Sequence, residues 1–527
     1  MSERAPDVDV AIVGGGHNGL VAAAYLARVG LRVRLLERLG QVGGAAVSAQ
    51  AFDGVEVRVS RYAYLVSLLP PRIVDDLGAA LRLGTRQFSS YTPQPANGGR
   101  CGLLIGSPGG RTADTFAAIG AAGDERGFAA FYRRCRLVTQ PLWPTLTEPL
   151  RTREQTRRHV LDGGSHDAAT AWRAMMDEPI GYAIADAVGN DLVRGVIATD
   201  ALIGTFARVD DPSLMQNICF LYHVLGGGTG DWHVPVGGMG SLTAALATAA
   251  VGHGAEITTG AEVYAVEPSG RVHYRIGDEE RLIRARFVLA GVTPAVLAGL
   301  LGEVAAPPTQ GAQVKVNMVL RRLPRLRDDN VTPEQAFAGT FHVNETWTQL
   351  DTAYSQAATG QVPNPLPCEA YCHSLTDPSI LSAELRDSGA QTITVFGLHT
   401  PHSLCGGTDS DMLRAQLTEM VLASLNSVLA EPIQELLLPD AHGWPCIETT
   451  TTLDLERALH MSGGNIFHGG LSWPFADDDD PLDTPARQWG VATDHDRIML
   501  CGSGARRGGA VSGIGGHNAA MAVLASV

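Results

Sequence analysis

The sequence lacks the cysteine and histidine patterns of redox-active disulfides and structural metal sites. Its eight cysteines are scattered along 527 residues without a CxxC pair, so no neighbouring thiols offer a disulfide relay. The 16 histidines are dispersed and no His-x-His occurs, so no cluster has metal-ligand spacing. We therefore expect reduced, mostly buried thiols of the kind found in cytosolic proteins, no catalytic cysteine and no bound metal.

Surplus basic charge and long apolar runs are also missing. The formal net charge is −15 and the isoelectric point is near 5.5, which disfavours nucleic acid as a partner. The N-terminus has Asp7 and Asp9 where a signal peptide needs basic residues, and no run of 18 apolar residues occurs. These absences predict a cytoplasmic protein. Peripheral contact with a membrane surface stays compatible with the sequence, and the oligomeric state is left open.

The N-terminal segment carries the dinucleotide-binding fingerprint in full order. An apolar run from Val10 to Val13 leads into Gly14-x-Gly16-x-x-Gly19, and a helix-forming stretch follows up to Ala27. A second predicted strand, 32–36, ends in Glu37, 18 residues after the third glycine. This order predicts a βαβ unit with a pyrophosphate at the helix N-terminus and a ribose diol at the acidic residue.

Two further glycine clusters stand beside predicted strands and helices. The first, 235–240, precedes a helical stretch and then short strands with turns at Gly260, Gly270 and Gly277. The second, 502–516, follows a predicted strand and precedes a helix. Residues 111–200 have helical spacing, 311–345 and 366–400 alternate as strands do, and 354–367 and 474–487 are predicted loops. At this length two or more domains are expected.

These blocks resemble the flavin-dependent amine oxidase and phytoene desaturase superfamily, and most closely its phytoene dehydrogenase-like branch. The motifs that carry the resemblance are Gly14–Gly19, Glu37-Arg38 with Gly43-Gly44, Pro235–Gly240, Gly463–Gly469 and Leu500–Gly504 with His517-Asn518. The resemblance implies an α/β fold with a discontinuous Rossmann-like FAD-binding domain (1–90, 220–310 and 485–527). It also implies an α+β substrate domain with a mixed or antiparallel sheet (91–219 and 311–484).

The resemblance implies one noncovalent FAD, because no cysteine or histidine that could tether flavin is identifiable. Glu37 would hold the adenosine ribose, and Arg38, Gly43 and Gly44 would line the diphosphate and ribityl region. The FAD-binding positions implied by the resemblance are Gly14, Gly16, His17, Asn18, Gly19, Glu37, Arg38, Gly43, Gly44, Ala45, Val263, Gly502, Ser503, Gly513 and Ile514.

Candidates for the catalytic side come from the second half of the chain and from the middle glycine cluster. They are Lys315, His342, His373 and Met239. Lys315 alternates in an apolar strand and is either near flavin N5, as in related amine oxidases, or a solvent-facing strand lysine, which is the commoner situation. Met239 either flanks the substrate side of the flavin or packs in the core. For each lone histidine, a hydrogen-bonded structural role is the ordinary alternative.

Flavin dehydrogenation requires a C–H bond held near N5 in a dry pocket, with the cofactor supplying the chemistry. The resemblance therefore predicts an FAD-dependent enzyme that desaturates a C–C or C–N bond of a largely apolar small molecule. Oxygen or a quinone would accept the electrons. Two alternatives remain open: an oxygenase or isomerase of the carotenoid-ketolase type, and a flavin-binding scaffold with little turnover.

Overall fold

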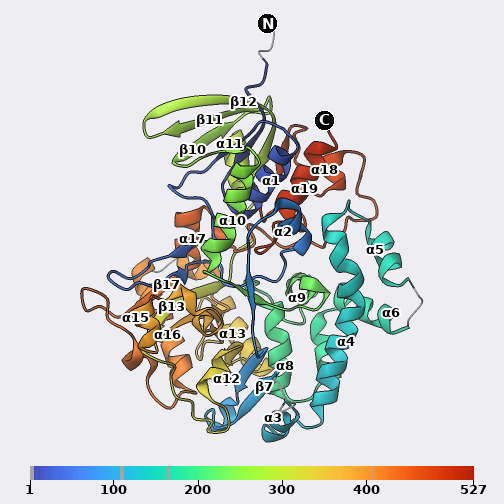
Figure 1. The fold of residues 1–527 in the computed structure, drawn as a ribbon. Helices are drawn as coiled ribbons and strands as arrows, with labels where there is room; N and C mark the ends of the chain where they lie inside the picture. The colour runs from blue at the N-terminus through green and yellow to red at the C-terminus, as the bar shows by residue number, and fades with distance from the viewer. Residues whose placement is uncertain (1–4, 107–111, 163–165, 407–408) are drawn as a thin grey trace.

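The computed structural model describes residues 5–106, 112–162, 166–406 and 409–527. Within them the chain forms two seven-stranded sheets and two small two-stranded ones. The first large sheet lies near the end of the molecule that carries both termini, and the second lies toward the opposite end (Figure 1). Several helices lie to one side of the second sheet: α4 (Asp124–Leu142), α5 (Arg153–Val160), α6 (His166–Trp172) and α8 (Asp191–Ala198).

The first sheet has a parallel centre and an antiparallel extension. Its centre runs in the order β9-β2-β1-β12-β18, and each of these pairs is parallel. The long strand β12 continues beyond β1 and pairs there with the antiparallel hairpin of β10 and β11. The strands of this sheet are β1 (Val8–Val13), β2 (Val33–Leu36), β9 (Glu256–Thr258), β10 (Ala261–Val266), β11 (Arg271–Ile276), β12 (Glu279–Ala290) and β18 (Ile498–Leu500).

Helix α1 (His17–Arg28) is the central helix of this sheet, and ten of its twelve residues are buried. It is apolar around most of its circumference because it also packs against α10 (Met239–Gly252) and α19 (Ile514–Leu524). The helix α11 (Pro294–Leu301) packs against β10. The predicted strand–glycine–helix–strand unit and the Rossmann-like α/β fold are thus confirmed.

The second sheet is mixed and runs in the order β17-β13-β16-β15-β14-β6-β7. Its pairs are antiparallel except for the parallel pair of β14 and β6. Its interior strand β13, next to the edge strand β17, is buried along its whole length, as is expected of a strand covered on both faces. The strands are β6 (Ser90–Pro93), β7 (Gly102–Ile105), β13 (Gln313–Leu320), β14 (Thr340–Val343), β15 (Cys368–Tyr371), β16 (Gln391–Leu398) and β17 (Ile447–Thr450).

The described residues of the region with helical spacing, 111–200, form helices as predicted, and α9 (Met215–Leu225) adds a further helix beyond that region. The α-helices of the region are α3 (Thr112–Ala118), α4 (Asp124–Leu142), α5 (Arg153–Val160), α6 (His166–Trp172), α7 (Ile180–Ala187) and α8 (Asp191–Ala198). Across the described part of the chain, no helix combines the length and apolarity that crossing a bilayer requires.

Short elements complete the fold. The small sheets pair β3 (Ser48–Ala49) with β4 (Val59–Ser60) and β5 (Leu83–Thr85) with β8 (His233–Pro235). The remaining α-helices are α2 (Pro71–Leu77), α12 (Pro333–Phe337), α13 (Trp347–Ala358), α14 (His373–Thr376), α15 (Ala383–Asp387), α16 (Ser410–Asn426), α17 (Thr452–Leu459) and α18 (Pro485–Gln488).

Several local expectations differ from the structure. The segments 311–345 and 366–400, expected to alternate as strands, also contain the short helices α12, α14 and α15. The loop expected from residue 354 begins only after Ala358, because the buried side chains of Leu350, Ala353 and Ala357 hold α13 against its neighbours. Strand β9 pairs with β2 in the parallel centre of the first sheet, although the sequence groups it with the short strands that follow it along the chain. A strand of three residues carries too little periodicity to specify its partner.

Candidate functional site

A cavity of about 450 Å³ lies at the carboxyl ends of the parallel strands, between the first sheet and the second. Residues that follow β1, β2 and β12 form one wall, among them Gly14, Glu37 and Gly291. The C-terminal glycine segment contributes Gly502 and Ser503. Ligands of open α/β sheets bind at this edge, so the topology alone marks the cavity as the candidate site.

The glycine turn after β1 fits a close backbone approach. Gly14 has a φ of +101°, and a Cβ at Gly19 would lie 2.3 Å from the Gly14 carbonyl oxygen. These two glycines are therefore needed for the turn and for helix packing. Gly16 differs, because a Cβ there would meet no atom within 4 Å. Gly16 is the N-cap of α1 and lines the cavity, so its missing side chain leaves room for a ligand at the helix N-terminus.

Glu37 stands at the end of β2 with its side chain held in place. Its Oε2 accepts a hydrogen bond from the Gly15 amide at 2.7 Å, and its Oε1 accepts one from the Leu39 amide at 2.8 Å. The residue is only 8% exposed and lines the cavity. Each carboxylate oxygen keeps a lone pair for a ligand hydroxyl. The neighbouring Arg38 also lines the cavity, and its guanidinium donates to the Ala458 carbonyl at 2.8 Å.

Several buried polar atoms along the cavity have no hydrogen-bond partner among the described residues. They include His17 Nε2, Asn18 Oδ1 and His468 Nδ1. Burial lowers the pKa of His17 to about 4, and the proximity of His468 acts in the same direction. The pKa of His468 is likewise lowered to about 4 by burial. Both imidazoles are therefore neutral at pH 7, and these atoms are available to a polar ligand.

On the side of the second sheet, Lys315 reaches the same cavity. It is 4% exposed, and its Nζ donates to the carbonyls of Ser60 at 2.6 Å and Tyr62 at 2.7 Å. The ammonium also lies over the rings of Tyr64 and Phe396, 5.9 and 5.4 Å from their centroids. Burial lowers the Lys315 pKa well below its usual value. The solvent-facing alternative for Lys315 is wrong, because both faces of β13 are covered.

The structure brings most of the predicted FAD-binding residues to this cavity. Gly14, Gly16, His17, Asn18, Gly19, Glu37, Arg38, Gly44, Ala45, Val263, Gly502 and Ser503 line it. The rest lie just behind the lining: the Gly43 amide donates to the Gly15 carbonyl, and Gly513 and Ile514 begin α19.

Met239 lies in the core instead of on the cavity wall. It is fully buried at the start of α10, and its amide donates to Ser60 Oγ. Of the two roles left open for it, the structure shows the packing one.

The two catalytic histidine candidates lie away from this cavity. His342 lines a second cavity of about 360 Å³, together with Arg86, Asp200, Glu369 and Tyr371. His373 lies behind that wall, with its ring stacked on Tyr371 at 6.3 Å and its Nε2 without a partner. The two cavities adjoin, because five residues line both: Tyr64, Leu65, Ile203, His223 and Trp232.

Burial governs the titration of the acidic groups at the second cavity. It raises the pKa of Asp200 to about 7, with the charge of Glu369 adding to the shift. It raises the pKa of Glu369 to about 7, with the charge of Glu345 adding to the shift, and it raises the pKa of Glu345 well above its usual value. Burial lowers the pKa of His342. The sequence analysis did not identify Arg86, Asp200, Glu345 or Glu369.

Sequence reasoning also missed the aromatic lining of the first cavity. Tyr62, Tyr64 and Phe396 stand there with Trp232. Tyr62 and Tyr64 alternate directly after β4, which is a weak signal for two side chains on one face. Nothing in the sequence indicates that Phe396, on β16, meets them.

Comparisons with known proteins identify one domain family and several relatives that this chain resembles in sequence. A sequence model of the NAD(P)-binding Rossmann-like domain matches residues 12–71. The uncharacterized protein Rv0897c of Mycobacterium tuberculosis is 75% identical, over 100% of this chain and 98% of its own length. Pyridine nucleotide-disulfide oxidoreductase domain-containing protein 2 of Rattus norvegicus is 30% identical, over 98% of this chain and 94% of its own length.

Solved structures share the fold at low sequence identity. A putrescine oxidase mutant has a TM-score of 0.56 and 16% identity, with 99% of each chain covered. Cyclohexylamine oxidase from Brevibacterium oxydans has a TM-score of 0.51 and 14% identity, also with 99% of each chain covered.

Proposed function

Because this chain belongs to the family of pyridine nucleotide-disulfide oxidoreductase domain-containing protein 2, we propose that it is an FAD-dependent oxidoreductase that dehydrogenates a largely apolar small molecule. One observation carries the proposal: a single cavity joins the dinucleotide fingerprint on one wall to a buried aromatic surface with Lys315 on the other. The disulfide named in that family has no counterpart in the spacing of these cysteines, and all eight are free thiols.

The residues at the first wall fit FAD. Gly16 leaves space at the N-terminus of α1 for a pyrophosphate, Glu37 is placed for ribose hydroxyls, and His17 and Asn18 present unpartnered buried polar atoms. We assign this wall to a discontinuous domain of residues 1–90, 220–310 and 485–527. The substrate domain is then 91–219 with 311–484.

When bound, FAD would supply a hydride acceptor at N5 of its ring. The chain's own contribution is a dry wall: Tyr64 and Phe396 exclude water and orient an apolar substrate. Lys315 places a polar group within this wall, where it can hold a water molecule or a developing charge. Putrescine oxidase and cyclohexylamine oxidase, which share the fold, act on amines by their names, so both a C–C and a C–N bond are retained as targets.

The cofactor assignment is tested on the purified protein. Acid precipitation is expected to release FAD into the supernatant, where chromatography identifies it, at about one equivalent per chain. Flavin that stays with the precipitated protein would contradict noncovalent binding, and NAD in place of FAD would contradict the cofactor itself.

The reaction class is tested by anaerobic mixing with a panel of apolar amines and alkenes. A dehydrogenase is expected to bleach the visible flavin band with at least one of them and to form a product two hydrogens lighter. A product that gains oxygen favours the oxygenase alternative. Bound flavin that no compound reduces, together with a stably co-purifying partner, favours the scaffold alternative.

A further inference from the structure

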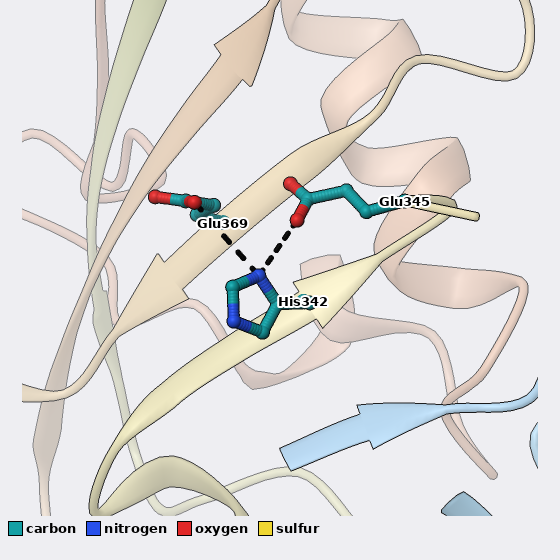
Figure 2. A group of neighbouring side chains, drawn as sticks. All are labelled: His342, Glu345 and Glu369. Atoms are coloured by element: carbon teal, nitrogen blue, oxygen red, sulfur yellow. Dashed lines mark hydrogen bonds and ion pairs between the residues drawn. The ribbon is translucent and has the colours of Figure 1, made fainter. Parts of the chain in front are cut away.

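Three buried side chains with metal-ligating atoms meet beside the second cavity: His342, Glu345 and Glu369 (Figure 2). His342 on β14 and Glu369 on β15 are cross-strand partners, so they project from the same face of the sheet. Glu345 follows β14 by two residues, and its carboxyl group points back toward the other two. Their exposed fractions are 5%, 0% and 1%.

The spacing of these atoms suits a small cation. His342 Nδ1 lies 2.6 Å from Glu345 Oε2 and 3.8 Å from Glu369 Oε1. One ligand atom from each residue lies within 4.8 Å of the others. Adjacent ligands of an octahedral ion with bonds near 2.1 Å are about 3 Å apart, so small side-chain rotations suffice to close the set around an ion.

The charge balance of the region also calls for a cation. Glu345 and Glu369 are buried carboxyl groups, the nearby Asp200 is partly buried, and Arg86 shares the second cavity with Asp200 and Glu369. Glu345 Oε1 is buried, and no residue in the described part of the chain forms a hydrogen bond with it. An ionised carboxylate with an unpaired buried oxygen is costly, and a coordinated metal removes that cost.

Neighbouring residues hold the three side chains in place through hydrogen bonds and close packing, as residues around the ligands of metal sites do. Thr199 Oγ1 donates to Glu369 Oε1 at 2.9 Å, and the Tyr371 hydroxyl donates to Glu369 Oε2. Helix α8 packs so tightly on the turn that a Cβ at Gly195 would lie 1.8 Å from the Glu345 carbonyl oxygen. The cluster is therefore fixed from two sides.

We propose that His342, Glu345 and Glu369 bind one divalent first-row transition-metal ion, of the Mn²⁺, Fe²⁺ or Zn²⁺ type. One imidazole nitrogen with two carboxylates matches the ligand preference of these ions. The second cavity, lined by His342, Glu369 and Asp200, provides the entry path and leaves coordination positions for water. The site is independent of the flavin assignment. The sequence alone does not reveal this metal site, because Glu369 is brought to His342 by the pairing of β14 with β15 and not by short spacing along the chain.

The flavin-containing protein is stripped with a chelator, desalted and dialysed against Mn²⁺, Zn²⁺ or Co²⁺, and the bound metal is measured by elemental analysis. We expect about one equivalent per chain, and for Co²⁺ visible absorption bands typical of nitrogen and oxygen ligands. Glu345→Gln and His342→Ala are expected to weaken binding by more than about tenfold. Tyr371→Phe, which removes only a supporting hydrogen bond, is expected to weaken it by about 10- to 100-fold.

Flavin content and the thermal midpoint report on folding of each variant. His399→Asn is the matched control: His399 is a buried histidine outside the cluster, and its φ of +52° suits asparagine. It is expected to bind metal as the wild type does. The proposal is overturned if the stripped protein takes up less than a tenth of an equivalent, or if folded Glu345→Gln or Tyr371→Phe binds as the wild type does. The proposal is also overturned if an added alkylammonium ion raises the thermal midpoint of the stripped protein while that protein takes up no metal.

Discussion

The amino group of Lys315 is held by backbone carbonyls, and no carboxylate in the segments that the structure describes forms an ion pair with it. Ser60, Tyr62 and Ala63 supply these acceptors, at 2.6, 2.7 and 3.4 Å from Nζ. All three lie in the segment that carries Tyr64 into the cavity, so the lysine also fixes the aromatic wall. Alternation along β13 correctly predicted a strand. It could not reveal which face is covered, because the chain that covers this face is more than 250 residues away.

Replacing Lys315 by methionine tests its role at the cavity. We expect flavin reduction by substrate, or reoxidation by oxygen, to slow at least about tenfold in stopped-flow measurements, with unchanged FAD content. Asn317→Leu is the matched control, because Asn317 projects from the same face of β13 and also bonds a backbone carbonyl, that of Arg61. It does not line the cavity. Wild-type rates for both half-reactions in Lys315→Met would show that the lysine is purely structural.

Substitutions of Glu37 test whether the cavity wall formed by the dinucleotide fingerprint binds FAD. In Glu37→Ala we expect FAD occupancy to fall further than in Glu37→Gln, because each hydrogen bond from a ribose hydroxyl to the charged group contributes roughly 1.5–3 kcal/mol. The glutamine keeps one acceptor oxygen for the Gly15 or Leu39 amide, and the alanine keeps none. The flavin-to-protein absorbance ratio after gel filtration measures the occupancy. Equal ratios in wild type and Glu37→Ala would remove Glu37 from the binding site.

The buried imidazole of His399 makes the folding stability of the protein depend on pH. It is fully buried, neither ring nitrogen has a hydrogen-bond partner within the described ranges, and burial lowers its pKa to about 3. The unfolded chain binds a proton near pH 6.5 and the folded chain does not, so stability falls as the pH falls below 6.5. Between pH 7.5 and 4.5 this histidine accounts for a loss of about 2–3 kcal/mol.

The variant His399→Asn should not lose this part of the folding stability when the pH falls to 4.5. Chemical denaturation of both proteins at the two pH values measures the difference. Part of the acid sensitivity should remain, since the pKa values of His17, His223 and His468 are also lowered by burial. If both proteins lose the same stability, His399 is already protonated in the fold.

At the scale of elements, the turn from β1 to α1 separates two kinds of glycine. Gly19→Ala drives a Cβ into the Gly14 carbonyl, whereas Gly16→Ala meets nothing within 4 Å in the protein. We expect Gly19→Ala to lower the stability of the flavin-free protein by roughly 1–3 kcal/mol through overpacking. Gly16→Ala should leave that stability unchanged and weaken FAD binding.

Thermal midpoints of the flavin-free proteins and FAD titrations of each variant distinguish the two effects. Gly30→Ala is a poor control, because Gly30 has a φ of +87°. Gly252→Ala at the end of α10 is a better one, since it has open space and no positive φ. Normal FAD affinity in Gly16→Ala would place the pyrophosphate elsewhere.

Local patterns predicted the elements best where a motif and a period coincide. The strand–glycine–helix unit at Val8–Val13 and His17–Arg28 was predicted within a few residues, because the apolar run, the glycines and the helix formers agree. The site at Glu369 was not predicted, because its meaning depends on cross-strand pairing with His342. The sequence shows that Glu369 is an acidic residue within an apolar strand, but it does not show which residue lies opposite on the neighbouring strand.

At the scale of the whole molecule, the first cavity is assembled from segments far apart in the chain. Its wall takes Gly14 from the start, Val263 and Gly291 from the middle and Gly502 from near the C-terminus. The three glycine clusters predicted this assembly, because each accompanies a strand or a helix of one nucleotide fold. The way the second sheet closes over it could not be predicted, since that depends on packing between β13, β16 and the segment after β4.

This assembly predicts that the C-terminal segment is essential to the fold. A chain ending at residue 496 lacks β18, which pairs with β12, and α19, which packs on α1 through Gly516, where a Cβ would lie 1.9 Å from the Asn18 carbonyl oxygen. Nine of the eleven residues of α19 are buried, so its loss exposes the apolar side of α1 to water. We expect this truncation to give insoluble or flavin-free protein. Removal of Ser526 and Val527 alone, which lie beyond α19, should leave flavin content and the thermal midpoint unchanged. A soluble, flavin-loaded protein ending at residue 496 would show that β1, β2 and β12 suffice to hold the cofactor, and that the two chain ends are not coupled through it.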